Sequence, residues 1–311
     1  MSRIGFVGLG TMGSRMAGRL LASGENVYGT NRTAAKAAAL IERGLAWCET
    51  PRDVARSAEV IFTMVTDDAA LATIGSGPDG ILAGLAPGKV WVDMSTVSPE
   101  AARVLAGRVE RLGAAFLNAP VSGSVPSAEQ GALEIMVGGD PRVFERVEPL
   151  LRKLGQRVTL VGRNDQALIL KLAININLAE QMLAFSEGVL LAERGGIDRK
   201  LAVEMIAASA VGSPMLKARA PLVVNLPQNA WFNLRLVQKD LRLALDVADA
   251  LHVPVPGAAV ADEMVTVARR LGYGERDLAA LFEALTKVGA SEVKQPPQVS
   301  TAATSGATHE P

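Results

Sequence analysis

Apolar residues in the first half of the chain form short runs that alternate with longer amphipathic segments. The runs are mostly apolar on both faces, which is typical of strands in a sheet covered by helices on both sides. They predict strands at residues 4–7, 27–30, 60–65, 90–94, 115–118, 134–137 and 158–161, with helices such as 14–23 and 99–111 between them. This rhythm predicts an α/β domain with a doubly wound parallel sheet.

The pattern changes after Gly162. Residues 165–194 are compatible with a single helix of ~45 Å, which Asn164 or Asp165 can cap and Gly195-Gly196 can end. Helical patterns follow at residues 199–208, 232–251, 258–271 and 277–285. We therefore predict a sheet domain over residues 1–163 and an all-α domain over 164–290, entered through a long interdomain helix. The polar tail, residues 291–311, is predicted to be disordered.

Composition and charge exclude several classes of protein. The 311 residues include 32 basic and 32 acidic side chains, so nothing favours binding to nucleic acid or an anionic membrane. The single cysteine, Cys48, excludes an internal disulfide and a zinc cluster, and it fits a reducing cytoplasm. The two histidines, His252 and His309, leave little basis for a Ser-His or Cys-His hydrolase. We expect a cytoplasmic protein without a metal site, a signal peptide or a membrane span.

A glycine-rich turn follows the first predicted strand and opens a helix. It reads Gly8-Leu9-Gly10-Thr11-Met12-Gly13, and this context makes the GxGxxG pattern specific for dinucleotides. Gly8 permits the tight turn, Gly10 lets the backbone approach a pyrophosphate, and Gly13 lets helix and strand pack closely. The free N–H groups of the helix N-terminus favour phosphate binding. All six residues are predicted to bind a dinucleotide in a Rossmann-type domain.

The end of the second strand favours NADPH over NADH. It reads Thr30-Asn31-Arg32-Thr33, with Lys36 one helical turn later. An acidic residue here would bind the ribose 2′-hydroxyl of NAD, and none is present. The Arg32 guanidinium, with donors from Asn31, Thr33 and Lys36, suits a 2′-phosphate instead.

Four segments resemble the β-hydroxyacid dehydrogenase family. They read IGFVGLGTMGSRMAGRL, NAPVSGSVPSAEQGALEIMVGGD, KLAIN and QKDLRLALDVADALHVPVP, in the family's order, within residues 2–288. That family includes 3-hydroxyisobutyrate dehydrogenase, tartronate semialdehyde reductase and the glyoxylate/succinic semialdehyde reductases. The Asn-Arg-Thr and Ser-Gly-Ser segments look closest to the NADPH-using glyoxylate/succinic semialdehyde reductases. The resemblance implies a reductase of small aldehyde acids, or a dehydrogenase of the corresponding hydroxy acids such as 3-hydroxyisobutyrate, that forms a homodimer through its α domain.

The resemblance also implies roles for individual residues. Lys171 is expected to be the general acid/base, because an ammonium in an apolar cleft loses pKa by desolvation. Asn175 lies one helical turn on, on the same face, and can hold the ammonium or the substrate oxygen. Ser122 with the amides of Gly123 and Ser124 follows a strand end, and is expected to bind a substrate carboxylate.

Four further residues complete the predicted site. Val65 and Thr96 lie at strand ends and are expected at the cofactor, Lys239 would reach back toward the nicotinamide, and Phe232 would form a wall of the substrate pocket. The chain also departs from the family pattern around the pocket, where substrate preference is decided. Asn118 replaces a common Asp, Ser124 replaces a glycine, Asp165 and Ala167 stand where glycines are usual, and Ile174 replaces an asparagine.

Two alternatives remain open, and two others are disfavoured. An imine reductase of the same superfamily typically has Asp or Tyr where Lys171 stands, which argues against imines as the native substrates without excluding their reduction. A non-catalytic NADP-binding module would not need Lys171, Asn175, Ser122 and Lys239 together. A 6-phosphogluconate dehydrogenase would share the first domain but carries a longer helical part. A short-chain dehydrogenase would need a Tyr-x-x-x-Lys pattern, which is missing.

Overall fold

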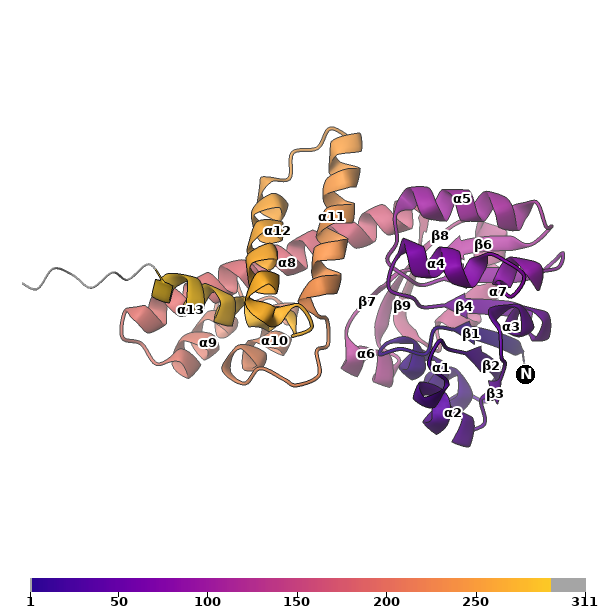
Figure 1. Cartoon of the computed structure of the whole chain (residues 1–311), viewed down its shortest axis with the longest axis horizontal. Coiled ribbons are helices and arrows are strands. Elements are labelled where there is room, and N and C mark those ends of the chain that lie inside the picture. Colours follow the sequence, from indigo (N-terminus) through magenta and orange to yellow (C-terminus); the bar gives the residue numbers. More distant parts are fainter. Residues whose placement is uncertain (1, 292–311) are drawn as a thin grey trace, which may run out of the picture.

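The computed structural model describes residues 2–291, so the predicted tail lies outside the described residues from position 292 onward. Figure 1 shows a sheet domain and a helical domain joined by one long helix, α8 (Asn164–Arg194). The strands are β1 (Arg3–Val7), β2 (Asn26–Thr30), β3 (Ala46–Trp47), β4 (Val60–Thr63), β5 (Val90–Asp93), β6 (Ala115–Asn118), β7 (Val121–Ser122), β8 (Leu133–Gly138) and β9 (Gly155–Gly162). All seven predicted strands are confirmed, and the short strands β3 and β7 are additions.

The strand order places a ligand crevice beside the glycine-rich turn. The order is β3-β2-β1-β4-β5-β6-β8-β7, with β9 on β8, and all pairs from β3 to β6 are parallel. From β1 the successive strands are added toward one edge of the sheet, and from β4 onward they are added toward the other edge. Dinucleotides bind at the carboxyl ends of the strands at such a switch point. The Rossmann-type, doubly wound domain is thus confirmed.

The sheet is parallel from β3 to β6 and mixed beyond β6, which the apolar pattern of the strands did not indicate. Strand β8 runs antiparallel to β6 and β7, and β7 continues β6 in the same register after a break at Pro120. The segment that joins β7 to β8 therefore returns along the same edge, through the short helix α6 (Val125–Gln130), without crossing the sheet. As a result, residues 119–124 extend beyond the carboxyl edge of the parallel strands, where ligands bind.

Helices cover both faces of the sheet, as the apolar strands predict. Phe62 and Val92 pack against α1 (Gly13–Ala22) and α7 (Pro141–Leu151), while their neighbours Ile61 and Trp91 face a second core. That core includes α3 (Pro51–Ser57), α4 (Asp68–Gly75), α5 (Pro99–Glu110) and the first turns of α8. Consecutive residues of a strand must therefore both be apolar. The short helix α2 (Ala38–Glu42) lies beside α1.

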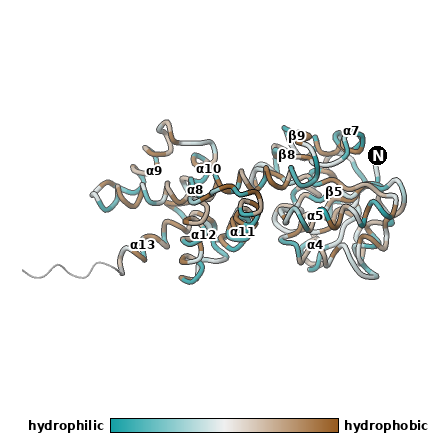
Figure 2. Tube along the Cα trace, turned by 90° about the horizontal axis from the view of Figure 1, so that it is seen from above, coloured by the Kyte–Doolittle hydropathy of each residue, from teal (hydrophilic) through white to brown (hydrophobic). Residues whose placement is uncertain are grey.

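Helix α8 carries the chain from the sheet to the helical domain. Its N-cap is Arg163, whose backbone N–H donates to the Gln166 side chain, so the prediction of Asn164 or Asp165 as the cap is wrong. The Asn164 side chain instead accepts from the backbone N–H of Asn118 at 2.9 Å, which fastens α8 to the end of β6. By length and composition α8 could cross a membrane, but it packs against elements of both the sheet domain and the helical domain; Figure 2 shows its apolar trace within the helical domain.

The second domain packs helices around the remainder of α8. They are α9 (Arg199–Ala208), α10 (Pro214–Val224), α11 (Leu234–Ala250), α12 (Pro256–Ala268) and α13 (Leu281–Ser291). A π-helical segment (Arg269–Tyr273) follows α12, and a short 3-10 turn (Leu278–Ala280) precedes α13. Helix α10 escaped prediction because Pro214 and Pro221 read as helix breakers, yet Pro214 begins the helix and Pro221 lies near its end.

Candidate active site

The turn after β1 has the backbone that its glycines predict. Gly8 has φ +96°, and an added Cβ would lie 2.3 Å from the Met64 carbonyl oxygen. A Cβ on Gly13 would lie 2.0 Å from the Gly8 carbonyl oxygen, so both positions require glycine. A Cβ on Gly10 would meet no atom within 4 Å, so the backbone there is open to a ligand.

Several amides of this turn have no acceptor among the described residues. The Leu9 N–H donates to Asn31 Oδ1 at 3.0 Å, and the Leu9 side chain lies in the core, so this residue holds the turn in place. Among residues 2–291, none accepts a hydrogen bond from the amides of residues 10–13, and no side chain caps α1. These free N–H groups at a helix N-terminus fit a diphosphate.

The end of β2 presents positive charge beside the turn. Arg32, Thr33 and Lys36 are exposed, and within the described chain Arg32 forms no hydrogen bond or ion pair. Asn31 differs from the other three because its amide nitrogen donates to the Thr33 carbonyl at 3.0 Å and its oxygen holds Leu9. Asn31 therefore braces the turn, and Arg32 with Lys36 supplies the charge.

A buried carboxylate ties the loops after β4 and β5 together. Asp93 Oδ1 accepts from the hydroxyls of Thr63 at 2.6 Å and Ser95 at 2.7 Å, and Ser95 Oγ accepts from the Val65 N–H at 2.9 Å. Burial raises the pKa of Asp93, while these hydrogen bonds and the Lys239 ammonium oppose the rise. Sequence reasoning missed Asp93, although it sets the positions of Val65 and the Ser95-Thr96 loop.

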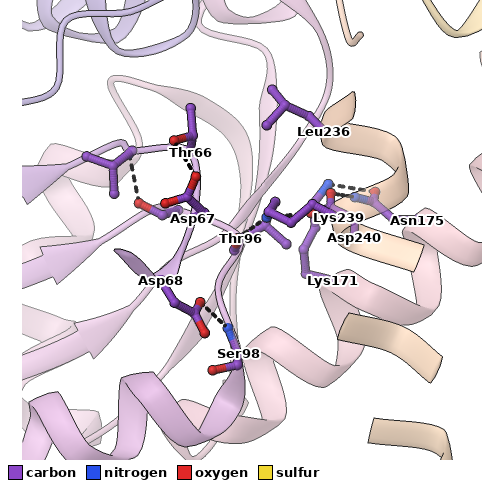
Figure 3. Close-up of polar contacts among 12 residues, drawn as sticks. Thr66, Asp67, Asp68, Thr96, Ser98, Lys171, Asn175, Leu236, Lys239 and Asp240 are labelled. Carbon is purple, nitrogen blue, oxygen red and sulfur yellow. Dashed lines mark hydrogen bonds and ion pairs between the residues drawn. The ribbon is translucent and has the colours of Figure 1, made fainter. Parts of the chain in front are cut away.

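A chain of polar contacts joins the two domains at Lys171 (Figure 3). The Lys171 ammonium donates to Asn175 Oδ1 at 2.8 Å, and Asn175 Nδ2 donates to Asp240 Oδ2. Asp240 Oδ1 lies 2.7 Å from the Lys239 ammonium, which also donates to the Thr96 carbonyl of the sheet domain. The chain thus runs from α8 through α11 to the loop after β5.

Burial changes the acidity of Lys171. The pKa of the ammonium is lowered from 10.5 to about 8, chiefly because burial disfavours the charged form; the Asp240 carboxylate opposes this shift and the Lys239 charge adds to it. A lysine with a pKa near 8 holds a proton at neutral pH and can release it within the range in which enzymes work.

Two adjoining cavities contain most of the predicted residues. The cofactor-side cavity, of about 230 Å³, is lined by residues that include Gly10–Gly13, Val65, Thr96, Phe232 and Lys239. The inner cavity, of about 370 Å³, is lined by residues that include Ser122, Gly123, Ser124, Lys171 and Asn175. Both cavities share Met12, Met64, Thr96, Trp231, Phe232 and Asp240, so they form one cleft between the domains.

Some predicted residues lie outside these cavities. Arg32, Thr33 and Lys36 follow β2, on the far side of the glycine turn, where the adenosine end of a dinucleotide would lie. A larger cavity of about 580 Å³ lies between α9 and α10 and contains no predicted site residue. Within residues 2–291 no group of three His, Cys, Asp or Glu side chains is placed to hold a metal.

The structure also adds residues that sequence reasoning missed. Asp240, next to Lys239, looked like part of a surface helix, but it is 3% exposed and faces Asn175. Met64, Trp231 and Arg219 line the inner cavity as well. No pattern in the sequence singled out Arg219, because the helix that carries it was not predicted.

Comparison with known proteins gives matches for both domains. Residues 3–162 match a family model described as the NAD binding domain of 6-phosphogluconate dehydrogenase. Residues 166–285 match one described as NAD-binding of NADP-dependent 3-hydroxyisobutyrate dehydrogenase.

Similar proteins cover nearly the whole chain. Glyoxylate/succinic semialdehyde reductase 1 of Arabidopsis thaliana is 35% identical over 91% of this chain and 98% of its own length. The 2-hydroxy-3-oxopropionate reductase of Escherichia coli (strain K12) is 36% identical over 91% of this chain and 97% of its own. The solved structure of Psf3 in complex with NADP+ and 2-OPP has a TM-score of 0.84 at 28% identity, and it covers 91% of this chain and 99% of its own.

The acidity of Lys171 can be tested directly. An NMR titration of its side chain, assigned by comparison with Lys171→Arg, should give a midpoint near pH 8. Asp240→Asn should lower that midpoint, because the ammonium loses an attracting charge, and Lys239→Gln should raise it. Asp246→Asn, an exposed carboxylate on the same helix, is the control and should leave the midpoint unchanged. Equal midpoints in all four proteins would contradict the coupling.

Proposed function

The chain belongs to the β-hydroxyacid dehydrogenase family, and from that premise we propose that it is an NADPH-dependent reductase of small aldehyde acids of the glyoxylate and succinic semialdehyde class. In the reverse direction it would oxidise the corresponding hydroxy acid. The observation that carries the proposal is Lys171, a partly buried ammonium with a pKa near 8 in a cavity that adjoins the glycine turn.

The chain's residues fit a dinucleotide phosphate. The free amides of residues 10–13 would bind the diphosphate, and Arg32 with Lys36 would bind the 2′-phosphate. The Thr96 loop and Lys239 would then lie beside the nicotinamide, because both line the cavity that continues from the turn. When bound, the reduced cofactor supplies hydride to a carbonyl carbon, and the oxidised form accepts hydride from a carbinol.

Lys171 would move the proton that accompanies this chemistry. In reduction its ammonium donates a proton to the carbonyl oxygen, and in oxidation the neutral amine takes the hydroxyl proton. Asn175 Oδ1 accepts a hydrogen bond from one N–H of the ammonium and so orients the other two N–H groups. Asp240 in turn accepts a hydrogen bond from the Asn175 amide nitrogen. Asn175 and Asp240 thus keep the lysine in position in the cavity.

The Ser122 loop would hold a carboxylate next to the reacting carbon. Ser122 and Ser124 have hydroxyls without a partner among the described residues, and the amides of Gly123 and Ser124 are also free there. Gly123 has φ +126°, and an added Cβ would lie 2.9 Å from Ser127 Cβ, so the loop requires glycine at this position. These donors face the cavity that contains Lys171.

Two other functions remain candidates. Imine reduction would use the same cavity and proton donor, and substrate profiling with cyclic imines would detect it. The second is a non-catalytic NADP-binding module. Such a module would not need a lysine that has a lowered pKa and is held in position by a chain of hydrogen bonds. Perturbed pKa values of this kind are concentrated at functional sites.

Lys171→Met tests the proposed chemistry. The change keeps most of the side-chain volume and removes the proton, so carbonyl reduction should fall ~100- to 10,000-fold while the Kd for NADPH stays within threefold. Lys171→Arg should not restore activity, since arginine stays protonated. In the wild type, kcat/KM for reduction should fall as pH rises through about 8, and that for oxidation should rise over the same range.

The control for this experiment is Lys200→Met, at an exposed position on α9. It should match the wild type in both directions. A Lys171→Met protein that reduces its best aldehyde within a few-fold of the wild-type rate would contradict the proposed mechanism.

Arg32→Asp tests the choice of cofactor. Replacing an attracting charge by a repelling one should raise the Kd of NADPH by about 10- to 100-fold and improve NADH relative to NADPH, as measured by fluorescence titration. Arg142→Asp, on α7 away from the turn, makes the same charge change and should have no effect. The assignment is wrong if the wild type binds NADH as tightly as NADPH.

We also propose that two copies associate through the helical domain. Large apolar side chains are strongly exposed there, among them Leu191 at 76% and Met205 at 64%. Met205→Glu should place a charge in the contact, and analytical ultracentrifugation should then show a shift from dimer toward monomer. Leu112→Glu, at an exposed position of the sheet domain, is the control. A monomeric wild type would refute the proposal.

A further inference from the structure

We propose that Arg219 is a second anion anchor in the inner cavity, so that preferred substrates carry an anionic group at the end remote from the carbonyl. This inference rests on the proposed function, and it narrows the substrate class to ω-carboxylated aldehydes. The Ser122 loop would serve carboxylates next to the reacting carbon, and Arg219 would serve those further away.

Arg219 is a buried cation with unused donors. Its residue is 4% exposed, and its Nη1 donates to Asp277 Oδ1 at 2.8 Å. A guanidinium has five N–H donors in a rigid fork, and within residues 2–291 the Arg219 side chain makes no other hydrogen bond. Burial lowers the pKa of Arg219 more than the Asp277 carboxylate raises it, so the charge is incompletely compensated.

The buried Asp277 carboxylate accepts hydrogen bonds from other donors besides Arg219. Its carboxylate also accepts from the backbone N–H groups of Trp231 at 2.8 Å, Phe232 at 3.2 Å and Ala279 at 3.1 Å. The carboxylate is therefore shared among four donors, whereas the guanidinium has one acceptor. An added anion in the cavity would accept from guanidinium N–H donors that have no acceptor among the described residues.

The position of Arg219 places this donor fork on the cavity wall away from the cofactor. Arg219 lines the inner cavity together with Ser122, Lys171 and Phe232. It belongs to α10, whose N-cap residue, Ser213, donates a hydrogen bond from its hydroxyl to Gln181 Oε1 of α8 at 2.7 Å. Gln181 follows Lys171 by ten residues, roughly 15 Å of helix. Arg219 thus approaches from the helical domain, and Ser122 and Thr96 approach from the sheet domain.

The charges in the cavity favour the same occupant. Lys171, Lys239 and Arg219 are cationic, and Asp240 is the carboxylate among the lining residues. Arg219 also lies near the Trp231 ring, with its guanidinium carbon 5.8 Å from the ring centroid. A planar fork beside an aromatic wall suits a carboxylate, which it can bind in two-point fashion.

The test compares succinic semialdehyde with its methyl ester, which keeps the same four-carbon aldehyde chain, adds one methyl group and carries no charge. With NADPH, wild-type kcat/KM should favour the acid at least tenfold. Arg219→Gln should reduce this preference about 10- to 100-fold, mainly through KM for the acid. Arg219→Lys should retain part of it. Glyoxylate, whose carboxylate adjoins the carbonyl, should be affected much less than succinic semialdehyde.

Two control variants separate binding from structure. Asp277→Asn loosens the loop but keeps the guanidinium, so the preference for the acid should persist. Lys217→Gln removes an exposed cation from the same helix, outside the inner cavity, and should also preserve it. A purely structural role for Arg219 would lower the activity on acid, ester and glyoxylate together and leave the preference unchanged.

The outcomes also distinguish this inference from the proposed function. A wild type that reduces acid and ester equally well overturns the role of Arg219, even if the variants do not fold, and leaves the reductase assignment standing. A wild type that reduces neither these aldehydes nor glyoxylate overturns the proposed function itself.

Discussion

Lys171 brings an ammonium group into a cleft between two apolar cores, and a charge that leaves water must be compensated or lose its proton. The compensation comes from a carboxylate on a different helix, reached through the Asn175 amide. Asp240 in turn is paired with Lys239, which donates to the Thr96 carbonyl. The position of α11 against α8, and of both against the sheet domain, is therefore linked to the acidity of one lysine.

The sheet supplies the other half of this geometry. Because β7 extends β6 beyond the parallel edge, Ser122 projects toward the interdomain cleft. The same edge holds the start of α8, since Asn164 accepts from the end of β6. Lys171 follows after about two helical turns. The hydrogen bond between these strand and helix ends thus fixes the start of the helix that carries Lys171 relative to the strand end that leads into the Ser122 loop.

Charge in the cleft is asymmetric. The glycine turn presents free amides, and Arg32 and Lys36 add positive charge at one end, which suits an anionic cofactor. The inner cavity continues this character with Lys171 and Arg219. An anionic cofactor and an anionic substrate can therefore occupy adjoining positions in the cleft. The carboxylate that lines both cavities, Asp240, accepts a hydrogen bond from Asn175 and forms an ion pair with Lys239.

Local sequence determined the features that depend on near neighbours. The apolar runs of the strands, the GxGxxG turn and the period of α8 each follow from residues within a few positions, and the structure confirms them. Lys171 and Asn175 could be placed on one face because helix periodicity alone sets that relation.

Only the tertiary structure decided which distant groups meet. The pairing of Asn175 with Asp240 spans 65 residues, and that of Lys239 with Thr96 spans 143. A Lys-Asp pair on a helix has the same sequence whether it faces solvent or a cleft, so the burial of Asp240 and its contact with Asn175 could not be predicted, and Lys239 was placed at the site only by the family resemblance. The antiparallel strand β8 and the donor fork of Arg219 were hidden for the same reason. Strand direction depends on the path of the connecting segment, and the environment of a charge depends on the packing of helices that are far apart in the chain.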